Sequence, residues 1–402
     1  MRDYLSTLER FLVTYRYCKL NVSRMDESIK ITTACQQVQC HECGYLVEVP
    51  PLVHRQRAQC PRCHYVITTY YQNMVRKLVA FSLAALVLMI AALSFNFLSF
   101  SANGQYHSIN IFSSIESLAD NDYMALAILQ SAVILVLPLT ILFCLLYLLI
   151  PVLFGKKPQH AAPLLKVIFA LRAWTMVEIF LVAVLVSLVK IMSMADIGIG
   201  LSFYAYALFA ICMTYTLMYM DEHQMYLTTS CALPKVHKRH SPSHSIQATW
   251  ALLLTSILLY VPANTLPIMH TDILGDDEPS TILGGVITLW KMGSYPIAAI
   301  IFIASIVVPV AKLCILCWLN FSVQAQFAGR KKTRMISYRF TEFIGRWSMI
   351  DVFVVAILVS LIQLGNIMSI YPGYAALAFC SVVILTMLAA ISFDTKLIWS
   401  DQ

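Results

Sequence analysis

The sequence has little charge and lacks the strings that mark common nucleotide-binding and hydrolytic enzymes. Only 12% of its 402 residues are Asp, Glu, Lys or Arg, whereas about 25% is usual for soluble domains. It contains no GxxxxGKS/T, GxSxG or HExxH string, so no P-loop ATPase, hydrolase elbow or zincin site of these kinds is expected. Residues 1–76 hold no apolar stretch typical of a cleavable signal peptide.

Apolar residues are abundant instead. They make up 59% of the chain, more than a soluble protein of this length can bury, so the sequence predicts a polytopic membrane protein. We expect an all-α fold with eight transmembrane helices. The apolar runs, each about 20 residues or more, cover residues 77–98, 123–153, 167–192, 200–220, 247–269, 293–320, 343–368 and 373–396.

The positions of Lys and Arg predict the orientation in the membrane. Such residues gather in cytoplasmic loops. Loops 154–166 and 321–342 contain them and loop 99–122 has none, so both termini are expected in the cytoplasm. The net charge of +7 lies in loops between apolar runs and does not indicate nucleic-acid binding.

A sequence repeat divides the apolar part into two halves. The window that begins Trp174-Thr175-Met176-Val177-Glu178-Ile179-Phe180 recurs as Trp347-Ser348-Met349-Ile350-Asp351-Val352-Phe353, 173 positions later. Pro138 and Pro309 also align, so a helix kink is expected in each half. This pattern predicts two tandem four-helix repeats with the same orientation.

Each copy of the window carries one carboxylate, Glu178 or Asp351, inside an apolar run. Burying such a charge costs roughly 2.5–3.5 kcal/mol, so it is a functional candidate. Lys312 and Asp351 are both expected about 12 Å deep on neighbouring helices. Ser305 and Thr386 are expected to converge on this pair, and Arg172 is a candidate partner for Glu178.

Simpler interpretations of these residues remain open. Lys312 can extend along the helix to reach the membrane interface, with Asp351 paired locally for stability. Ser305 and Thr386 can donate to carbonyls of their own helices. In the first half Lys312, Ser305 and Thr386 align with Ile141, Ile134 and Met213. We therefore expect the second half to carry any coupling site.

Four cysteines have the spacing of a metal site. Cys40 and Cys43 are followed after sixteen residues by Cys60 and Cys63, and two such CxxC knuckles hold one structural Zn²⁺. A redox dithiol is the alternative. His64 completes a CxxCH string, but the second CxxC and the cytoplasmic position favour zinc over haem attachment.

These features divide the chain into five expected parts. They are a tail (1–34), a cytoplasmic β-rich zinc ribbon (35–70), a first four-helix repeat (71–220), a cytoplasmic linker (221–246) and a second four-helix repeat (247–402).

Several strings resemble the paraquat-inducible protein A family, PqiA, whose sister group is LetA. They include the four-cysteine ribbon, Pro262-Ala263-Asn264-Thr265-Leu266-Pro267-Ile268-Met269, Ala304-Ser305-Ile306-Val307-Val308-Pro309, and Gly345-Arg346-Trp347-Ser348-Met349-Ile350-Asp351. The resemblance implies a bacterial inner-membrane protein, not an enzyme, that moves phospholipid-like molecules between membranes with a periplasmic MCE-domain partner. It also implies a second ribbon between the halves, but residues 221–246 hold a single cysteine, Cys231, with His237, His240 and His244 near it, so a second metal site there is left open.

Three hypotheses follow. The chain is a lipid transporter subunit, driven by protons through the buried charges, or a membrane scaffold or sensor in which the ribbon docks a partner. A membrane redox enzyme that cycles Cys40 and Cys43 is the third.

Overall fold

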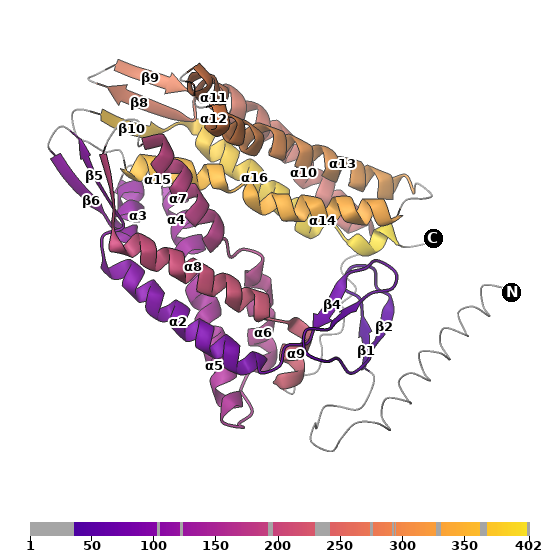
Figure 1. Ribbon diagram of the computed structural model, residues 1–402. Helices are drawn as coiled ribbons and strands as arrows, with labels where there is room; N and C mark the ends of the chain where they lie inside the picture. The colour runs from indigo at the N-terminus through magenta and orange to yellow at the C-terminus, as the bar shows by residue number, and fades with distance from the viewer. Residues whose placement is uncertain are drawn as a thin grey trace.

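The computed structural model describes residues 36–102, 105–120, 124–191, 196–229, 242–273, 276–291, 293, 295–326, 331–361 and 368–399. Two groups of long helices form its body, and a small two-hairpin ribbon lies near one end (Figure 1). The predicted class, a helical membrane protein with an N-terminal ribbon, is confirmed. The predicted tail 1–34 and Cys231 lie outside the described residues.

The ribbon consists of two antiparallel hairpins. Strands β1 (Gln36–Gln39) and β2 (Leu46–Val49) form the first, and β3 (Arg57–Gln59) and β4 (Val66–Thr69) form the second. Each hairpin encloses one CxxC pair at its turn. The strand prediction for this segment is therefore confirmed.

In its described residues, the first half has eight α-helices after the ribbon. They are α2 (Met74–Ser94), α3 (Ile111–Asp120), α4 (Met124–Ser131), α5 (Leu137–Leu153), α6 (Ala161–Arg172), α7 (Val177–Ile191), α8 (Leu201–Tyr219) and the short α9 (Glu222–Thr228). A π-helical segment lies between α4 and α5.

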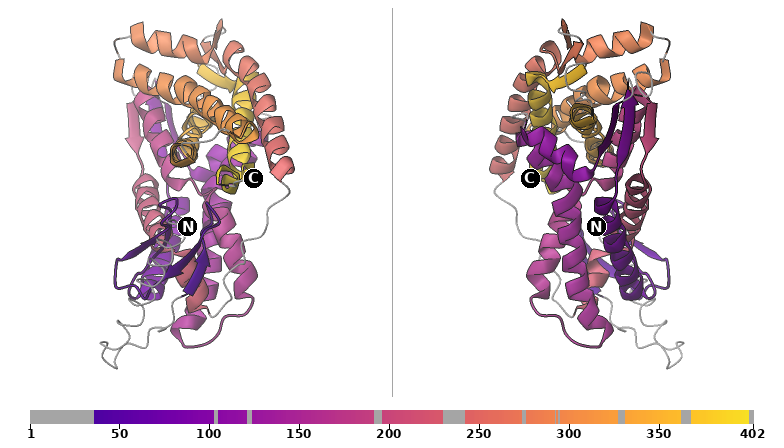
Figure 2. Two further views of the ribbon diagram at one scale, coloured as in Figure 1. Left: turned by 90° about the vertical axis from the view of Figure 1, so that its right-hand side faces the viewer. Right: turned by 90° about the vertical axis from the view of Figure 1, so that its left-hand side faces the viewer.

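The second half presents its elements in the same order. They are α10 (Pro242–Thr265), α11 (Ile282–Lys291), α12 (Tyr295–Phe302), α13 (Val308–Gln324), α14 (Lys331–Trp347), α15 (Ile350–Leu361), α16 (Tyr374–Ser392) and a 3₁₀ turn, η4 (Thr395–Ile398). The side views show the two halves as separate groups of helices, purple to magenta and orange to yellow (Figure 2).

Seven segments of the described chain are long and apolar enough to cross a membrane. They cover Met74–Ser94, Leu126–Leu153, Ala161–Leu188, Leu201–Tyr219, Ser243–Thr265, Ile303–Gln324 and Tyr374–Ser392. These seven match predicted runs. The remaining predicted run, 343–368, contains the end of α14 and all of α15, and its residues 362–367 lie outside the description.

Segments 99–122 and 270–292, which lie between predicted apolar runs, contain strands and a helix. Strands β5 (Leu98–Ala102), β6 (Gln105–Ile109) and β7 (Asp196–Ile199) form an antiparallel sheet in the order β6-β5-β7. Strands β8 (Met269–Ile273), β9 (Asp276–Ser280) and β10 (Met368–Pro372) form the matching sheet, β9-β8-β10. Both sheets lie at the end of the molecule away from the ribbon (Figure 1).

A π-helical segment precedes the aligned proline in each half. These segments are η2 (Ala132–Val136), before Pro138, and η3 (Ile303–Val307), before Pro309. Proline has no N–H and its ring clashes with the carbonyl four residues earlier, so the widened turn relieves a conflict that the sequence dictates. The expected irregularity thus takes the form of a π-helix.

The two halves meet through the repeated window itself. Helix α7 packs against α15, and the rings of Phe180 and Phe353, which are aligned residues, lie edge to face with centroids 5.8 Å apart. Both side chains are buried in one continuous apolar core. The carboxylate-bearing helices of the two halves are therefore neighbours at the centre of the molecule.

Two aligned glycines join the last strand of each sheet to the helix that follows it. The N–H of Gly200 donates to Phe97 O, and that of Gly373 to Ile268 O. A Cβ on Gly200 would collide with the carbonyl oxygen of Asn96, and one on Gly373 with that of Pro267. Only glycine allows this close backbone approach.

We predict that Gly373→Ala lowers the free energy of unfolding by about 2 kcal/mol, because the added Cβ overlaps backbone that cannot move away freely. Thermal unfolding in detergent measures the change. Gly285→Ala is the matched control, since its Cβ would meet nothing within 4 Å. An equal effect of both substitutions would contradict the steric explanation.

Candidate functional site

Four cysteine side chains meet in one buried cluster within the ribbon. The Sγ atoms of Cys40, Cys43, Cys60 and Cys63 all lie within 4.8 Å of one another. Cys40 and Cys63 are 3.6 Å apart, and Cys43 and Cys60 are 3.5 Å apart. A tetrahedral Zn²⁺ with bonds of about 2.3 Å would separate its sulfurs by about 3.8 Å. The cluster therefore fits a four-coordinate metal ion.

The two knuckles have the same backbone hydrogen bonds. Cys40 N–H donates to Tyr45 O and Gly44 N–H to Cys40 O, and the second knuckle repeats the pattern from Cys60 N–H and His64 N–H. Gly44 and His64 have φ of 71° and 58°, the left-handed conformation that favours glycine. His64 thus occupies the glycine position of its knuckle, and its side chain is exposed.

The thiols are in an environment that suits a bound cation. Burial raises the pKa of Cys43 to about 12 and also raises the pKa of Cys40. Burial acts in the same direction on Cys60, but backbone N–H groups of Cys63 and Arg62 oppose it, and the pKa of Cys60 is lowered. Four thiolates in one buried cluster need a metal to balance their charge.

One carboxylate, that of Asp221, links the ribbon to the end of the first half. Asp221, which caps α9, accepts hydrogen bonds from Thr68 Oγ1 (2.8 Å), Thr69 N (2.8 Å) and Gln224 N (3.0 Å). Gln224 also exchanges two hydrogen bonds with the backbone of Tyr71. The second hairpin therefore has a fixed position on α9.

The second half contacts the other side of the ribbon. Arg62 Nη2 donates to Trp399 O (3.1 Å), and the guanidinium lies 4.9 Å from the Trp399 ring centroid. Arg339 Nη2 of α14 donates to Cys63 O (3.1 Å) and stacks over the ring of Tyr65. Residues of both halves thus hold the ribbon, and the contacts reach the metal-binding knuckle.

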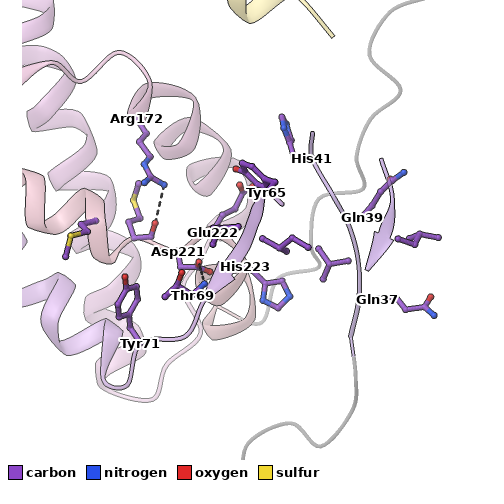
Figure 3. A pocket seen from close by; sticks show the side chains of 16 residues that line it. Gln37, Gln39, His41, Tyr65, Thr69, Tyr71, Arg172, Asp221, Glu222 and His223 are labelled. Atoms are coloured by element: carbon purple, nitrogen blue, oxygen red, sulfur yellow. Dashed lines mark hydrogen bonds between the residues drawn. The ribbon is translucent and has the colours of Figure 1, made fainter. Parts of the chain in front are cut away.

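Beside these contacts, a cleft of about 770 Å³ lies between the ribbon and the first half. Figure 3 shows Tyr65, Arg172, Asp221, Glu222 and His223 around it. Burial raises the pKa of Tyr65 to about 12, raises that of Glu222 and lowers that of His223. In each case burial favours the neutral form of the side chain.

Lys312 lies inside the second half. Its side chain is only 2% exposed, and Nζ has no hydrogen-bond partner among the described residues. It lies on α13, which packs against α10, α14 and α16. The side chain points into protein and does not extend along its helix to the interface.

The two predicted hydroxyl residues are also buried. Ser305, in the π-helical segment η3, and Thr386, on α16, are each 2% exposed. Thr386 Oγ1 donates to Val383 O of its own helix (2.9 Å), as the simpler interpretation expects. Ser305 is four residues before Pro309, so its carbonyl lacks the usual helical donor.

A break in the helix precedes each carboxylate, which the apolar pattern did not indicate. Helix α6 ends at Arg172 and α7 begins at Val177, and α14 ends at Trp347 and α15 begins at Ile350. Glu178 and Asp351 therefore lie in the first turn of a new helix, whose dipole favours negative charge. The side chain of Asp351 is outside the description.

A pairing of Arg172 with Glu178, proposed as a candidate from the sequence, is not observed among the described residues. Arg172 Nη1 donates to the backbone carbonyl of Met220 (3.3 Å). Glu178 Oε2 has no hydrogen-bond partner in the part of the chain that the structure describes. The buried hydroxyl of Tyr206 on α8 likewise has no hydrogen-bond partner there. The sequence did not indicate this residue, because a single tyrosine in an apolar run is not a distinctive pattern.

The profile of the family described as "Paraquat-inducible protein A" matches the chain twice, at residues 75–229 and 246–402. The chain is 36% identical to the "Intermembrane transport protein PqiA" of Escherichia coli K12, covering 92% of this chain and 97% of that protein. It is 28% identical to a "Probable intermembrane transport protein" of Haemophilus influenzae, covering 90% and 95%. It is also 28% identical to the "Lipophilic envelope-spanning tunnel protein A" of E. coli, covering 90% of each. No solved structure matches.

We predict that Cys60→Ser abolishes stable metal binding, because three thiolates and a hydroxyl bind a structural metal far more weakly than four thiolates. Metal analysis of the purified protein is expected to give one zinc per chain before the change and less than half afterwards. Cys144→Ser, in α5, is the control and retains the metal. Full zinc content in the Cys60 variant would exclude the cluster as the site.

We also predict that Asp221→Ala loosens the ribbon by about 2 kcal/mol, because it removes the acceptors of two hydrogen bonds from the ribbon, those of Thr68 and Thr69. Hydrogen exchange at the Thr69 amide, which donates to Asp221, is expected to accelerate. Asp394→Ala changes the aligned cap of η4 and leaves Thr69 protected. Unchanged exchange in the Asp221 variant would show that other contacts hold the hairpin.

Proposed function

Since the chain belongs to the paraquat-inducible protein A family, we propose that it is the inner-membrane subunit of an intermembrane lipid transport system. It passes phospholipid-like molecules to or from a periplasmic MCE-domain partner. Relatives that align over nearly their whole length are named intermembrane transport proteins, and another carries "lipophilic" and "tunnel" in its name. A transporter, not an enzyme, fits these names and the seven apolar spans.

The buried amino group of Lys312 is the observation that supports an active transport role. A cation with no hydrogen-bond partner among the described residues is costly inside a membrane bundle, and such groups usually serve ion pathways or proton relays. The first-half position aligned with it is Ile141. An apolar residue therefore suffices for packing, and Lys312 has another purpose.

We propose that proton movement through Lys312 and Asp351 drives transport, with Ser305 and Thr386 as polar neighbours. An amine and a carboxylate change their protonation states when water enters or leaves their surroundings. If the bundle opens alternately to each side of the membrane, water would reach these groups and be excluded from them in turn. Glu178 and Arg172 in the first half would support the gate.

The same proposal orients the protein. The ribbon, a Cys₄ zinc site and both termini lie in the cytoplasm, where thiolates stay reduced. The two three-stranded sheets, at the opposite end of the helices, then face the periplasm and the MCE-domain partner. Zinc is structural, since all four ligand positions are taken by buried cysteines.

A scaffold or sensor is the second candidate function. The ribbon contacts both halves, through Asp221 on one side and Arg339 on the other. A cytosolic partner that bound the ribbon would thus act on both halves without any transport by this chain. Under this reading the buried charges only stabilise the bundle.

Substitution of Asp351 by Asn distinguishes the two functions. We expect delivery of fluorescent phospholipid from proteoliposomes to the MCE-domain partner to fall on the order of tenfold, because the amide cannot exchange a proton. Lys190→Gln, which copies the aligned Gln363, is the control and leaves delivery unchanged. Normal delivery by the Asn variant at a normal protein level would remove Asp351 from the mechanism.

A further inference from the structure

Gly345 lies where the ammonium group of Lys312 ends. A Cβ on Gly345 would be 3.0 Å from Lys312 Nζ, 3.2 Å from Cε and 4.0 Å from Cδ. Gly345 is itself buried, in the last turn of α14. The end of the lysine side chain therefore occupies the space that any other residue would fill with its own Cβ.

The backbone does not require glycine at this position. Gly345 is not among the glycines with positive φ, and it stands inside a helix, where glycine is less favourable than alanine. Within the described residues, the atoms that a Cβ would meet belong only to Lys312. Space for this one side chain is the physical reason for glycine here.

The first half shows the opposite combination. The position aligned with Gly345 is Arg172, and the position aligned with Lys312 is Ile141. In the first half, where α5 has Ile141 and no cation at this position, the following helix α6 ends with a large residue, Arg172. In the second half, where α13 has Lys312, the residue aligned with Arg172 is Gly345. The two positions thus differ together between the halves, as a steric pair would.

We infer that Gly345 is the positioning residue of Lys312: its missing Cβ lets the ammonium lie against the last turn of α14. Carbonyl oxygens at a helix C-terminus carry partial negative charge and favour a cation there. That turn leads into the break before Asp351. The inference deepens the proposed function, because it assigns a residue that fixes one member of the proposed charge pair.

The ammonium has few ways to move away. Lys312 is enclosed by the packing of α13 against α10, α14 and α16, and close-packed interiors do not absorb added atoms freely. Contact at 3.0 Å is tighter than ordinary van der Waals contact. An alanine at 345 must therefore shift the ammonium by some tenths of an ångström, and a valine must displace it altogether.

The test combines stability and transport in the full-length protein. In the natural background Gly345→Ala is expected to lower the melting temperature. In the Lys312→Ala background the same change is expected to raise it, because alanine favours the helix and the clash is gone. The control Gly285→Ala, another helical glycine with nothing within 4 Å, behaves alike in both backgrounds. Equal effects of Gly345→Ala in both backgrounds would overturn the inference.

Transport supplies the second readout. Lipid delivery by Gly345→Ala is expected to fall on the order of tenfold at equal amounts of folded protein, and by Gly345→Val further, because a small misplacement of a reacting group is costly. If delivery is normal in Gly345→Ala, positioning by Gly345 is wrong. If delivery is normal in Lys312→Ala while the two-background difference in melting temperature persists, the proposed function fails and the steric pair stands.

Discussion

The central constraint on this molecule is that a bilayer offers no water to a polar group, so protein must surround each one. In the second half the buried Lys312 lies among elements whose irregular backbone is also present in the first half. The π-helical segment with Ser305 precedes it on the same helical path, and the last turn of α14 with Gly345 closes over it.

The repeat makes the two halves an internal comparison. Both have the prolines, the π-helical segments, the helix break before the carboxylate and the glycine at the start of the last helix. These shared features build the framework. The side chains around position 312 are among the differences: the second half has Lys312 and Gly345 where the first half has Ile141 and Arg172. The contact between Phe180 and Phe353 joins the two frameworks. A structural change in one half is therefore transmitted directly to the other half.

Local patterns predicted local structure well, and contacts between distant segments escaped prediction. Cysteine spacing identified the metal cluster because the four ligands lie on two short knuckles. Apolar length identified seven spans, but it could not reveal the breaks before Glu178 and Asp351, since apolar residues continue through them. The three-stranded sheets combine strands far apart in the chain, and the role of Gly345 depends on a lysine thirty-three residues earlier.

The comparison between halves also bears on whether Lys312 merely stabilises the bundle. Replacing a buried ionised group by a well-packed apolar residue is often neutral or stabilising, and Ile141 shows that this fold accepts an apolar residue at the aligned position. A scaffold would therefore gain from losing Lys312 and refilling the space left by Gly345. The chain instead combines Lys312 with Gly345, a glycine that leaves space for the end of the lysine side chain. Two unfavourable choices that fit each other are better explained by a functional role of the lysine than by a contribution to stability.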